Sequence, residues 1–156
     1  RVIDFSPYGY DERQYCSPGF DLPVGSLQRS RHGTFPEYHT SADDLTFIAP
    51  EHLGASLGVI EDVLAILERD GRFLNLFPKC EPQLGKRGLY AAVGGSPRAP
   101  ETTMAMLWVL NQSDGGPTLL DIAERSGLPF SVIADAAELL AAHGLIVPAA
   151  SSPAAS

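Results

Sequence analysis

The stretch from Thr118 to Val147, TLLDIAERSGLPFSVIADAAELLAAHGLIV, is compatible with few folds. Its apolar residues recur at helical spacing on both sides of Gly127. Gly127 suits a turn between two helices, Pro129 suits a helix start, and Gly144 suits a helix end before the apolar residues LIV. The sequence therefore predicts a helix, a turn, a second helix and a strand, in that order.

This order of elements resembles a small winged helix-turn-helix domain. A further helix is expected over Thr102–Asn111, which is apolar. We expect the domain to fold as a separate unit around one apolar core. The predicted core residues are Leu107, Leu110, Leu120, Ile122, Ile133, Leu139, Leu140 and Ile146.

The charge of this segment argues against DNA binding. The second helix of such a domain can lie in the major groove and present side chains to base edges. Here that helix carries Asp135 and Glu138 and no Lys or Arg, and residues 100–156 contain one basic residue, Arg125, against six acidic ones. Phosphate binding is driven by clustered Lys and Arg, and the whole chain has a formal net charge of −8. We therefore expect no nucleic-acid partner and favour packing, protein contact or homo-oligomer formation through this domain.

The segment GGSPRAP, residues 94–100, combines Gly, Pro and Ser in one short run and indicates a linker. We therefore expect a domain boundary near residue 97, which separates a domain over residues 1–96 from the winged-helix-like domain over residues 97–148. The final residues, AASSPAAS at 149–156, have nothing to bury, and they predict a disordered tail.

Upstream of this linker the sequence predicts both strands and helices. Val2–Phe5, Leu22–Leu27 and Phe73–Phe77 are candidate strands, and the polar segment YDERQYCSPGFDLP is expected to hold a short helix. From Pro50 to Asp70 apolar residues recur at helical spacing, with charged residues on the other face. The predicted class of residues 1–96 is therefore α/β.

No segment predicts a membrane protein or a secreted one. The chain lacks the apolar run of about 20 residues that a bilayer span needs, and its N-terminus lacks a basic-then-apolar signal segment. Cys16 and Cys80 are too far apart for a CxxC pair. We expect a cytoplasmic protein with no membrane partner. Because the chain opens in the apolar run RVIDF without an initiator Met, we also expect it to be part of a longer protein.

The segment Phe35–Leu45, FPEYHTSADDL, gathers a histidine, two hydroxyls and several carboxylates. A metal-ligating imidazole commonly donates its second N–H to a carboxylate, and Asp43 follows His39 by four positions. His39 is therefore a candidate metal ligand, and Asp43 is a candidate for orienting it. In the alternative interpretation, Ser41 and Asp43 cap the long helix that follows. The residues alone leave both interpretations open.

Several longer segments resemble one family. The segments DERQYCSPG, LPVGSL, YHTSADDL and CEPQLGKRGLY are similar to the C-terminal part of bacterial aminopeptidase-like proteins that carry a C-terminal winged helix. Those proteins are related to the zinc aminopeptidases that use two metal ions. The resemblance covers residues 1–148. It implies the C-terminal part of a zinc-peptidase-like α/β domain, followed by a small winged-helix-like domain.

The resemblance also implies roles for particular residues. In the zinc aminopeptidases the last metal ligand is a histidine in an HTxxD-type segment, which here runs from His39 to Asp43. Zinc is then the expected cofactor, with His39 as its ligand and Asp43 orienting that histidine. The segment DERQYCSPG stands where those enzymes have an SDH-type segment, with Glu12 in place of the histidine. Asp11 and Arg13 of this segment are candidate substrate contacts. Arg87 is a further candidate on its own chemistry, because a guanidinium can bind a substrate carboxylate or phosphate with two hydrogen bonds, and a surface or interface salt bridge is the favoured alternative for it.

The implied function is that of a zinc-dependent, aminopeptidase-like amide hydrolase acting on a peptide or another amide-bearing small substrate. One histidine cannot hold two metal ions, so the other ligands and the general base are expected in a preceding segment, and this chain alone is expected to be inactive. The alternatives are a non-catalytic binding or scaffolding module on a peptidase frame and, less favoured, a DNA-binding regulator. His32, in SRHG, is expected to be a solvated turn residue.

Overall fold

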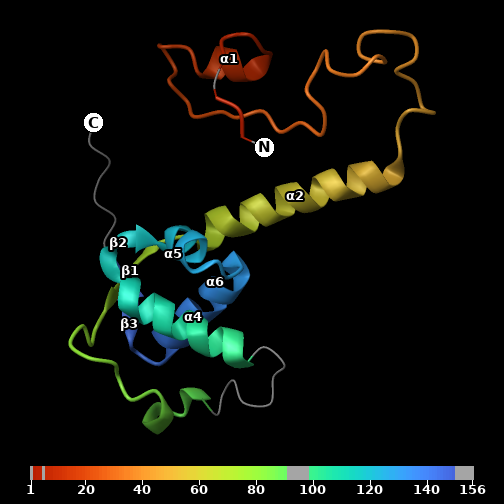
Figure 1. Cartoon of the computed structure of the whole chain (residues 1–156). Helices are drawn as coiled ribbons and strands as arrows, with labels where there is room; N and C mark the ends of the chain where they lie inside the picture. The colour runs from red at the N-terminus through yellow and green to blue at the C-terminus, as the bar shows by residue number, and fades with distance from the viewer. Residues whose placement is uncertain (1, 5, 91–98, 150–156) are drawn as a thin grey trace. The chain divides into compact units, whose positions relative to one another are not determined.

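The computed structural model describes residues 2–4, 6–90 and 99–149 (Figure 1). The chain divides into two compact units, Arg1–Leu57 and Gly58–Ser156, and each is described separately below. The fold combines helices with one small sheet. No described helix is long and apolar enough to cross a membrane.

The first unit consists mainly of turns and loops. Its short helix α1, Asp11–Tyr15, lies in the polar segment where the sequence predicts one. The strands predicted over Val2–Phe5 and Leu22–Leu27 are wrong, because the described residues of both segments are not in strands. An isolated strand has no partner for its backbone groups, and Val24 instead donates its N–H to the Leu22 carbonyl in a local turn (2.9 Å).

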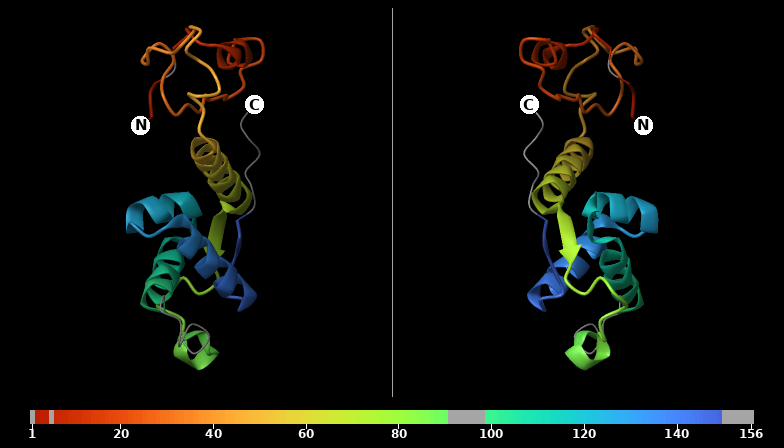
Figure 2. Two further views of the ribbon diagram at one scale, coloured as in Figure 1. Left: turned by 90° about the vertical axis from the view of Figure 1, so that its right-hand side faces the viewer. Right: turned by 90° about the vertical axis from the view of Figure 1, so that its left-hand side faces the viewer.

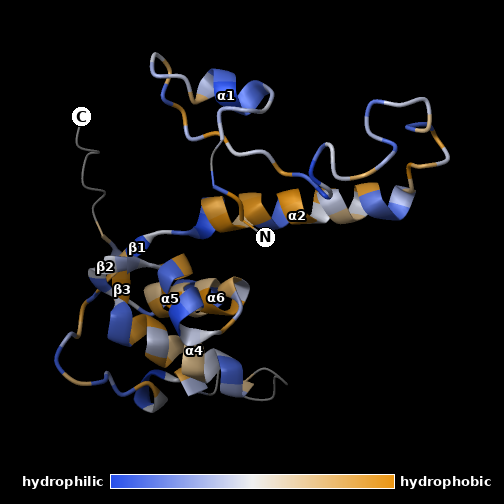
Figure 3. Ribbon diagram, turned by 45° about the horizontal axis from the view of Figure 1, so that its top comes forward, coloured by the Kyte–Doolittle hydropathy of each residue, from blue (hydrophilic) through white to orange (hydrophobic). Residues whose placement is uncertain are grey.

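The long helix α2, Pro50–Arg69, matches the helix predicted from apolar spacing. None of its residues is buried, although several of its turns are apolar, as the orange segments of α2 show (Figure 3). Leu67, for example, is 69% exposed, and Leu53 is 62% exposed. Packing usually contributes most of the stability of an amphipathic helix, and the described residues do not bury this one.

The second unit contains a three-stranded antiparallel sheet in the order β2-β1-β3. The strands are β1, Arg72–Asn75; β2, Asp114–Thr118; and β3, Ile146–Pro148. In the central strand, Arg72 lies opposite Thr118 of β2, and Phe73 lies opposite Pro148 of β3. The predicted strand at residues 73–77 therefore exists, but it belongs to the winged-helix unit.

This pairing moves the domain boundary away from the predicted position near residue 97. The strand β1 is hydrogen-bonded on both sides, so it cannot belong to a domain that ends at residue 96 without breaking the sheet. The contacts instead divide the chain between Leu57 and Gly58. Residues 91–98, which hold most of GGSPRAP, and residues 150–156 of the predicted tail lie outside the described residues. The composition of a segment does not reveal which strands pair on either side of it.

Three helices accompany this sheet (Figure 2): α4, Ala99–Gln112; α5, Leu119–Ser126; and α6, Phe130–Ala142. A short 3-10 helix, η1, covers Gly85–Arg87. Thr118 and Asp121 form a capping box at the start of α5. Gly127 ends α5 with a φ of +71°, in the left-handed region that glycine adopts without strain, which confirms the predicted turn. The predicted helix, turn, helix, strand order is confirmed.

The core of the second unit lies between these helices and the sheet. Five predicted core residues are buried, namely Leu110, Ile122, Ile133, Leu140 and Ile146. Leu107 and Leu139 are half-buried and pack against this core. Leu120 is also half-buried but is not among the packed residues, and its backbone N–H donates to Asp70 Oδ1 (2.9 Å). The predicted core omitted several large buried residues, among them Leu84, Leu89, Met106, Leu119 and Leu145.

Candidate functional site

His39 lies in a tight turn of the first unit and is exposed to solvent. Its φ is +57°, a left-handed backbone conformation that is uncommon for a residue other than glycine. Thr40 stabilises the turn, because its hydroxyl donates to the Glu37 carbonyl (2.8 Å) and accepts from the Ala42 N–H (3.2 Å). The imidazole stacks on the Tyr38 ring, with centroids 4.1 Å apart and planes inclined by 13°. The turn thus presents an accessible imidazole on one ring face of Tyr38.

Asp43 is exposed, and its backbone N–H donates to the Thr40 carbonyl (3.2 Å). Among the described residues, no hydrogen bond joins its carboxylate to His39. The alternative role as a helix cap is wrong for Ser41 and Asp43, because α2 begins only at Pro50. The neighbouring Asp44 stabilises a local turn by accepting from Thr46 Oγ1 (2.6 Å) and the Thr46 N–H (2.8 Å). These bonds hold the pKa of Asp44 below its usual value.

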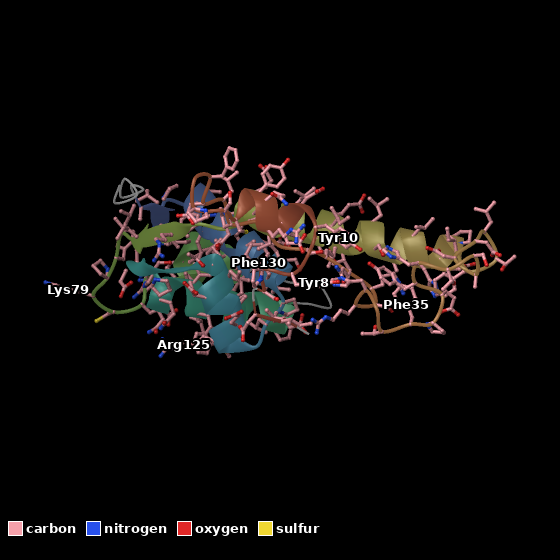
Figure 4. The ribbon with its side chains drawn as sticks, turned by 90° about the horizontal axis from the view of Figure 1, so that it is seen from above. Tyr8, Tyr10, Phe35, Lys79, Arg125 and Phe130 are labelled. Carbon is pink, nitrogen blue, oxygen red and sulfur yellow. The ribbon has the colours of Figure 1, made fainter. Side chains whose placement is uncertain are left out.

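Three tyrosines surround His32 close to this turn. The His32 ring centroid is 6.0 Å from Tyr8, 5.7 Å from Tyr10 and 6.0 Å from Tyr38. The hydroxyls of Tyr10 and Tyr38 are hydrogen-bonded to each other, and this bond is the largest cause that raises the pKa of Tyr38 to about 12. His32 lies in a turn, as predicted, but it is half-buried among aromatic rings and not fully solvated. Figure 4 labels Tyr8, Tyr10 and Phe35 within these loops.

The three predicted substrate contacts lie in different parts of the chain. Asp11 and Arg13 are exposed residues of α1, which starts directly after Tyr10 and therefore lies in the same unit as His39. Arg87 belongs to the other unit, where its guanidinium carbon lies 4.7 Å from the centroid of the Phe77 ring. Its contact with substrate remains a prediction, as do those of Asp11 and Arg13.

A cavity of about 690 Å³ opens beside the turn, entirely within the first unit. The rings of Phe35 and Phe47 line it, and these rings stack on each other with centroids 5.9 Å apart. Arg29, Glu37 and Asp43 contribute charges of both signs to the lining. The volume lies within the range of about 300 to 1,000 Å³ that is usual for small-molecule sites. The cavity can therefore accommodate a small polar molecule that carries both an apolar part and charged groups.

The residues around His39 are consistent with one ligand of a zinc site. An exposed neutral imidazole can bind zinc, and a zinc ion usually takes about four ligands. Among the described residues, no group of three or more His, Cys, Asp or Glu side chains could hold a metal ion. The further ligands of such a site therefore have to come from outside the described residues.

Two family models match the chain. Residues 1–70 match a domain of unknown function (DUF4910), and residues 72–148 match a winged helix-turn-helix family. The second match agrees with the helix and strand order of the second unit. The two matches meet near residue 71, just before the central strand β1.

Two relatives come from Clostridium acetobutylicum. One is provisionally named a polysaccharide biosynthesis protein with an aminopeptidase-like domain, and it is 52% identical over 139 residues, which cover 89% of this chain and 32% of that protein. The other is a crystal structure provisionally described as a peptidase, with a TM-score of 0.83 and 46% identity over 95% of this chain and 32% of that chain. The chain thus spans about a third of the length of these relatives.

Proposed function

We propose that this chain acts as part of a zinc-dependent, aminopeptidase-like amide hydrolase in which His39 is one metal ligand. The observation that carries the proposal is the left-handed, Thr40-stabilised turn that leaves the His39 imidazole exposed. The peptidase-related descriptions of the two relatives support it. When bound, zinc would polarise an amide carbonyl and activate a water molecule. The proposed substrate is a peptide or another amide-bearing small molecule in the cytoplasm.

We also propose that the site is completed by a segment outside this chain. The exposed apolar residues of the first unit support this, because residues such as Phe20, Leu45 and Val2 are 70%, 87% and 97% exposed. A folded protein usually covers such a concentration of apolar side chains. The relatives are about three times as long as the part that this chain matches, so they contain enough additional chain to do so. The expected consequence is that this chain alone does not hydrolyse amides.

The second candidate is a non-catalytic binding module built on the same frame. The cavity of about 690 Å³ favours it, because that cavity needs no metal ion to hold a ligand. Glu37 and Asp43 can receive a positively charged group there, and Arg29 can receive a carboxylate. A protein of this kind would bind a small zwitterion without hydrolysing it. Measured turnover separates this candidate from the hydrolase.

A chimeric protein would test the proposed hydrolase function. This chain would replace the matching third of the Clostridium relative, and release of nitroaniline from aminoacyl nitroanilides would be measured with zinc present. We expect the chimera to hydrolyse these compounds, the His39→Ala chimera to lose at least about 100-fold in rate, and the present chain alone to be inactive. His143→Ala, which removes an exposed histidine of the other unit, is the control and should leave the rate unchanged. Full activity of the His39→Ala chimera would contradict the proposed role.

The winged-helix domain is proposed to make protein contacts rather than to bind nucleic acid. Both carboxylates of α6, the helix that would enter the major groove, pair with one cation of α2: Arg69 Nη2 lies 2.5 Å from Asp135 Oδ1 and 2.9 Å from Glu138 Oε1. These contacts raise the pKa of Arg69 further above its already high value, so the cation persists at every working pH. The groove-reading face of α6 is thus acidic, and it is occupied by a contact within the chain.

An electrophoretic shift experiment at low salt tests this part of the proposal. We expect no shift of duplex DNA at micromolar chain concentrations, because counterion release needs several Lys or Arg contacts to phosphate. The variant Asp135→Lys with Glu138→Lys adds two cations to the same helix and serves as the comparison. Clear binding of DNA by the unaltered chain would show that another surface carries the contact.

A further inference from the structure

The orientation of the His39 ring depends on one side-chain contact in the described part of the chain. The imidazole stacks on the ring of Tyr38, with centroids 4.1 Å apart and planes inclined by 13°. The ring nitrogens of His32 and His143 take part in hydrogen bonds, whereas no such bond within the described residues reaches the His39 ring. A metal-ligating histidine commonly has its ring oriented by a hydrogen bond from its second nitrogen. In His39 the stack is the contact that can do this.

Stacking leaves the nitrogens of the imidazole free for chemistry. Metal ligation uses the lone pair of one ring nitrogen, and hydrogen bonding uses the N–H of the other, and both lie in the plane of the ring. The Tyr38 ring covers a face of the imidazole instead, because the two planes are nearly parallel. The stack can therefore hold the ring plane of His39 while one nitrogen binds a metal ion and the other donates to a carboxylate.

Tyr38 is itself held by contacts from two segments of the first unit. Its hydroxyl is hydrogen-bonded to the hydroxyl of Tyr10, which directly precedes α1. Phe35 meets the Tyr38 ring nearly edge-on, with centroids 5.6 Å apart and planes inclined by 74°. The Tyr38 N–H also donates to the Phe35 carbonyl (3.4 Å), and the residue is half-buried. The ring under His39 is thus anchored across 28 positions of the sequence.

We propose that Tyr38 is a positioning residue for His39, and that Tyr10 anchors Tyr38 through the bond between their hydroxyls. The left-handed turn, with a φ of +57° at His39, sets where this side chain starts. The stack then restricts the rotation of the ring that the backbone leaves free. A ring that is ordered in advance loses less conformational freedom on binding, so it binds metal more tightly. The inference rests on the proposed function, in which His39 is a zinc ligand.

NMR of the complete chain, labelled at histidine and free of metal, tests the stack without zinc. At about pH 8, where an ordinary histidine is neutral, the ring current of Tyr38 should move the His39 ring protons upfield of those of the exposed His143. The His39 signals are those that His39→Ala removes. We expect Tyr38→Phe to keep the upfield shift and Tyr38→Leu to abolish it. Tyr15→Leu, which removes an exposed tyrosine of α1 in the same unit, is the matched control and should keep it.

The same variants in the chimera with the Clostridium relative would give the effect on metal binding. Zinc dissociation constants would be measured by competition with a chromophoric chelator, with folding checked by circular dichroism. We expect Tyr38→Leu to bind zinc about tenfold more weakly. Tyr38→Phe and Tyr10→Phe should each lose less than about threefold, because they keep the stacked rings and remove only the hydroxyl bond. Tyr15→Leu should bind zinc as the unaltered chimera does.

Three results would overturn the inference and leave His39 as a ligand. They are unshifted His39 protons in the unaltered chain, unchanged zinc binding by a folded Tyr38→Leu chimera, and equal losses of zinc affinity for Tyr38→Phe and Tyr38→Leu. If the folded His39→Ala chimera instead keeps its zinc, the proposed function fails and the positioning role falls with it, whatever the NMR shows of the stack.

Discussion

At the scale of single residues, contacts between loops determine how the residues of the candidate site are arranged. The HTSAD context predicts His39 as a metal ligand; the residue is exposed in a left-handed turn, and its role as a ligand remains a prediction. The tyrosine cluster around His32 could not be predicted, because Tyr10 and Tyr38 are 28 positions apart and no local pattern links them. The helix-cap interpretation of Asp43 failed for a related reason. The loop continues to Pro50, a length that cap preferences do not specify.

The hydrogen bond between Tyr10 and Tyr38 gives a prediction for the titration of Tyr38. The bond favours the neutral phenol and raises its pKa from 10.0 to about 12, so its stabilising effect is present below pH 10 and is lost as the pH rises through about 12. Carbon-13 NMR of labelled tyrosine would follow the ring. Tyr10→Phe should return the Tyr38 titration toward its ordinary value, whereas Tyr8→Phe should shift it much less. If Tyr38 titrates normally in the unaltered chain, the two loops are not joined in this way.

At the scale of elements, regular patterns were predicted well and pairings were not. The apolar spacing over residues 50–70 and the glycines at 127 and 144 located α2, α5 and α6 correctly. The glycine-rich strand β2, DGGPT, has no β-branched alternation and was missed. The segment of β1 was recognised as a strand but assigned to the wrong domain. Strand pairing depends on partners about 40 and 70 positions away, which periodicity does not reveal.

The sequence places Leu120 and Leu140 in the same core, and a stability measurement would distinguish their contributions. Leu140 is fully buried between the helices of the second unit, so Leu140→Ala should lower the free energy of unfolding by about 2 to 5 kcal/mol. Leu120 is only half-buried, and Leu120→Ala should cost clearly less. Urea unfolding followed by circular dichroism would compare the two. Equal losses, or no loss for Leu140→Ala, would show that the core is drawn incorrectly.

At the scale of the whole molecule, the two units differ in how they are stabilised. The second unit has a continuous apolar core, whereas no described residue of Arg1–Leu57 is buried. The two family matches meet later in the chain, between residues 70 and 72, after the end of α2. We therefore expect the winged-helix unit to fold on its own. The first unit, in contrast, matches part of longer proteins, since this chain covers 32% of each relative.

Zinc content tests the proposed role of His39 most directly. The chimera with the Clostridium relative would be purified as the unaltered form and as His39→Ala, Asp43→Asn and His143→Ala, and bound zinc would be measured by elemental analysis with folding checked by circular dichroism. We expect His39→Ala to lose most of its zinc, because it removes a direct metal bond, and Asp43→Asn to bind zinc about 10 to 100-fold more weakly. His143→Ala should keep all of its zinc. A folded His39→Ala chimera with the zinc content of the unaltered form would contradict the assignment of His39 as a ligand.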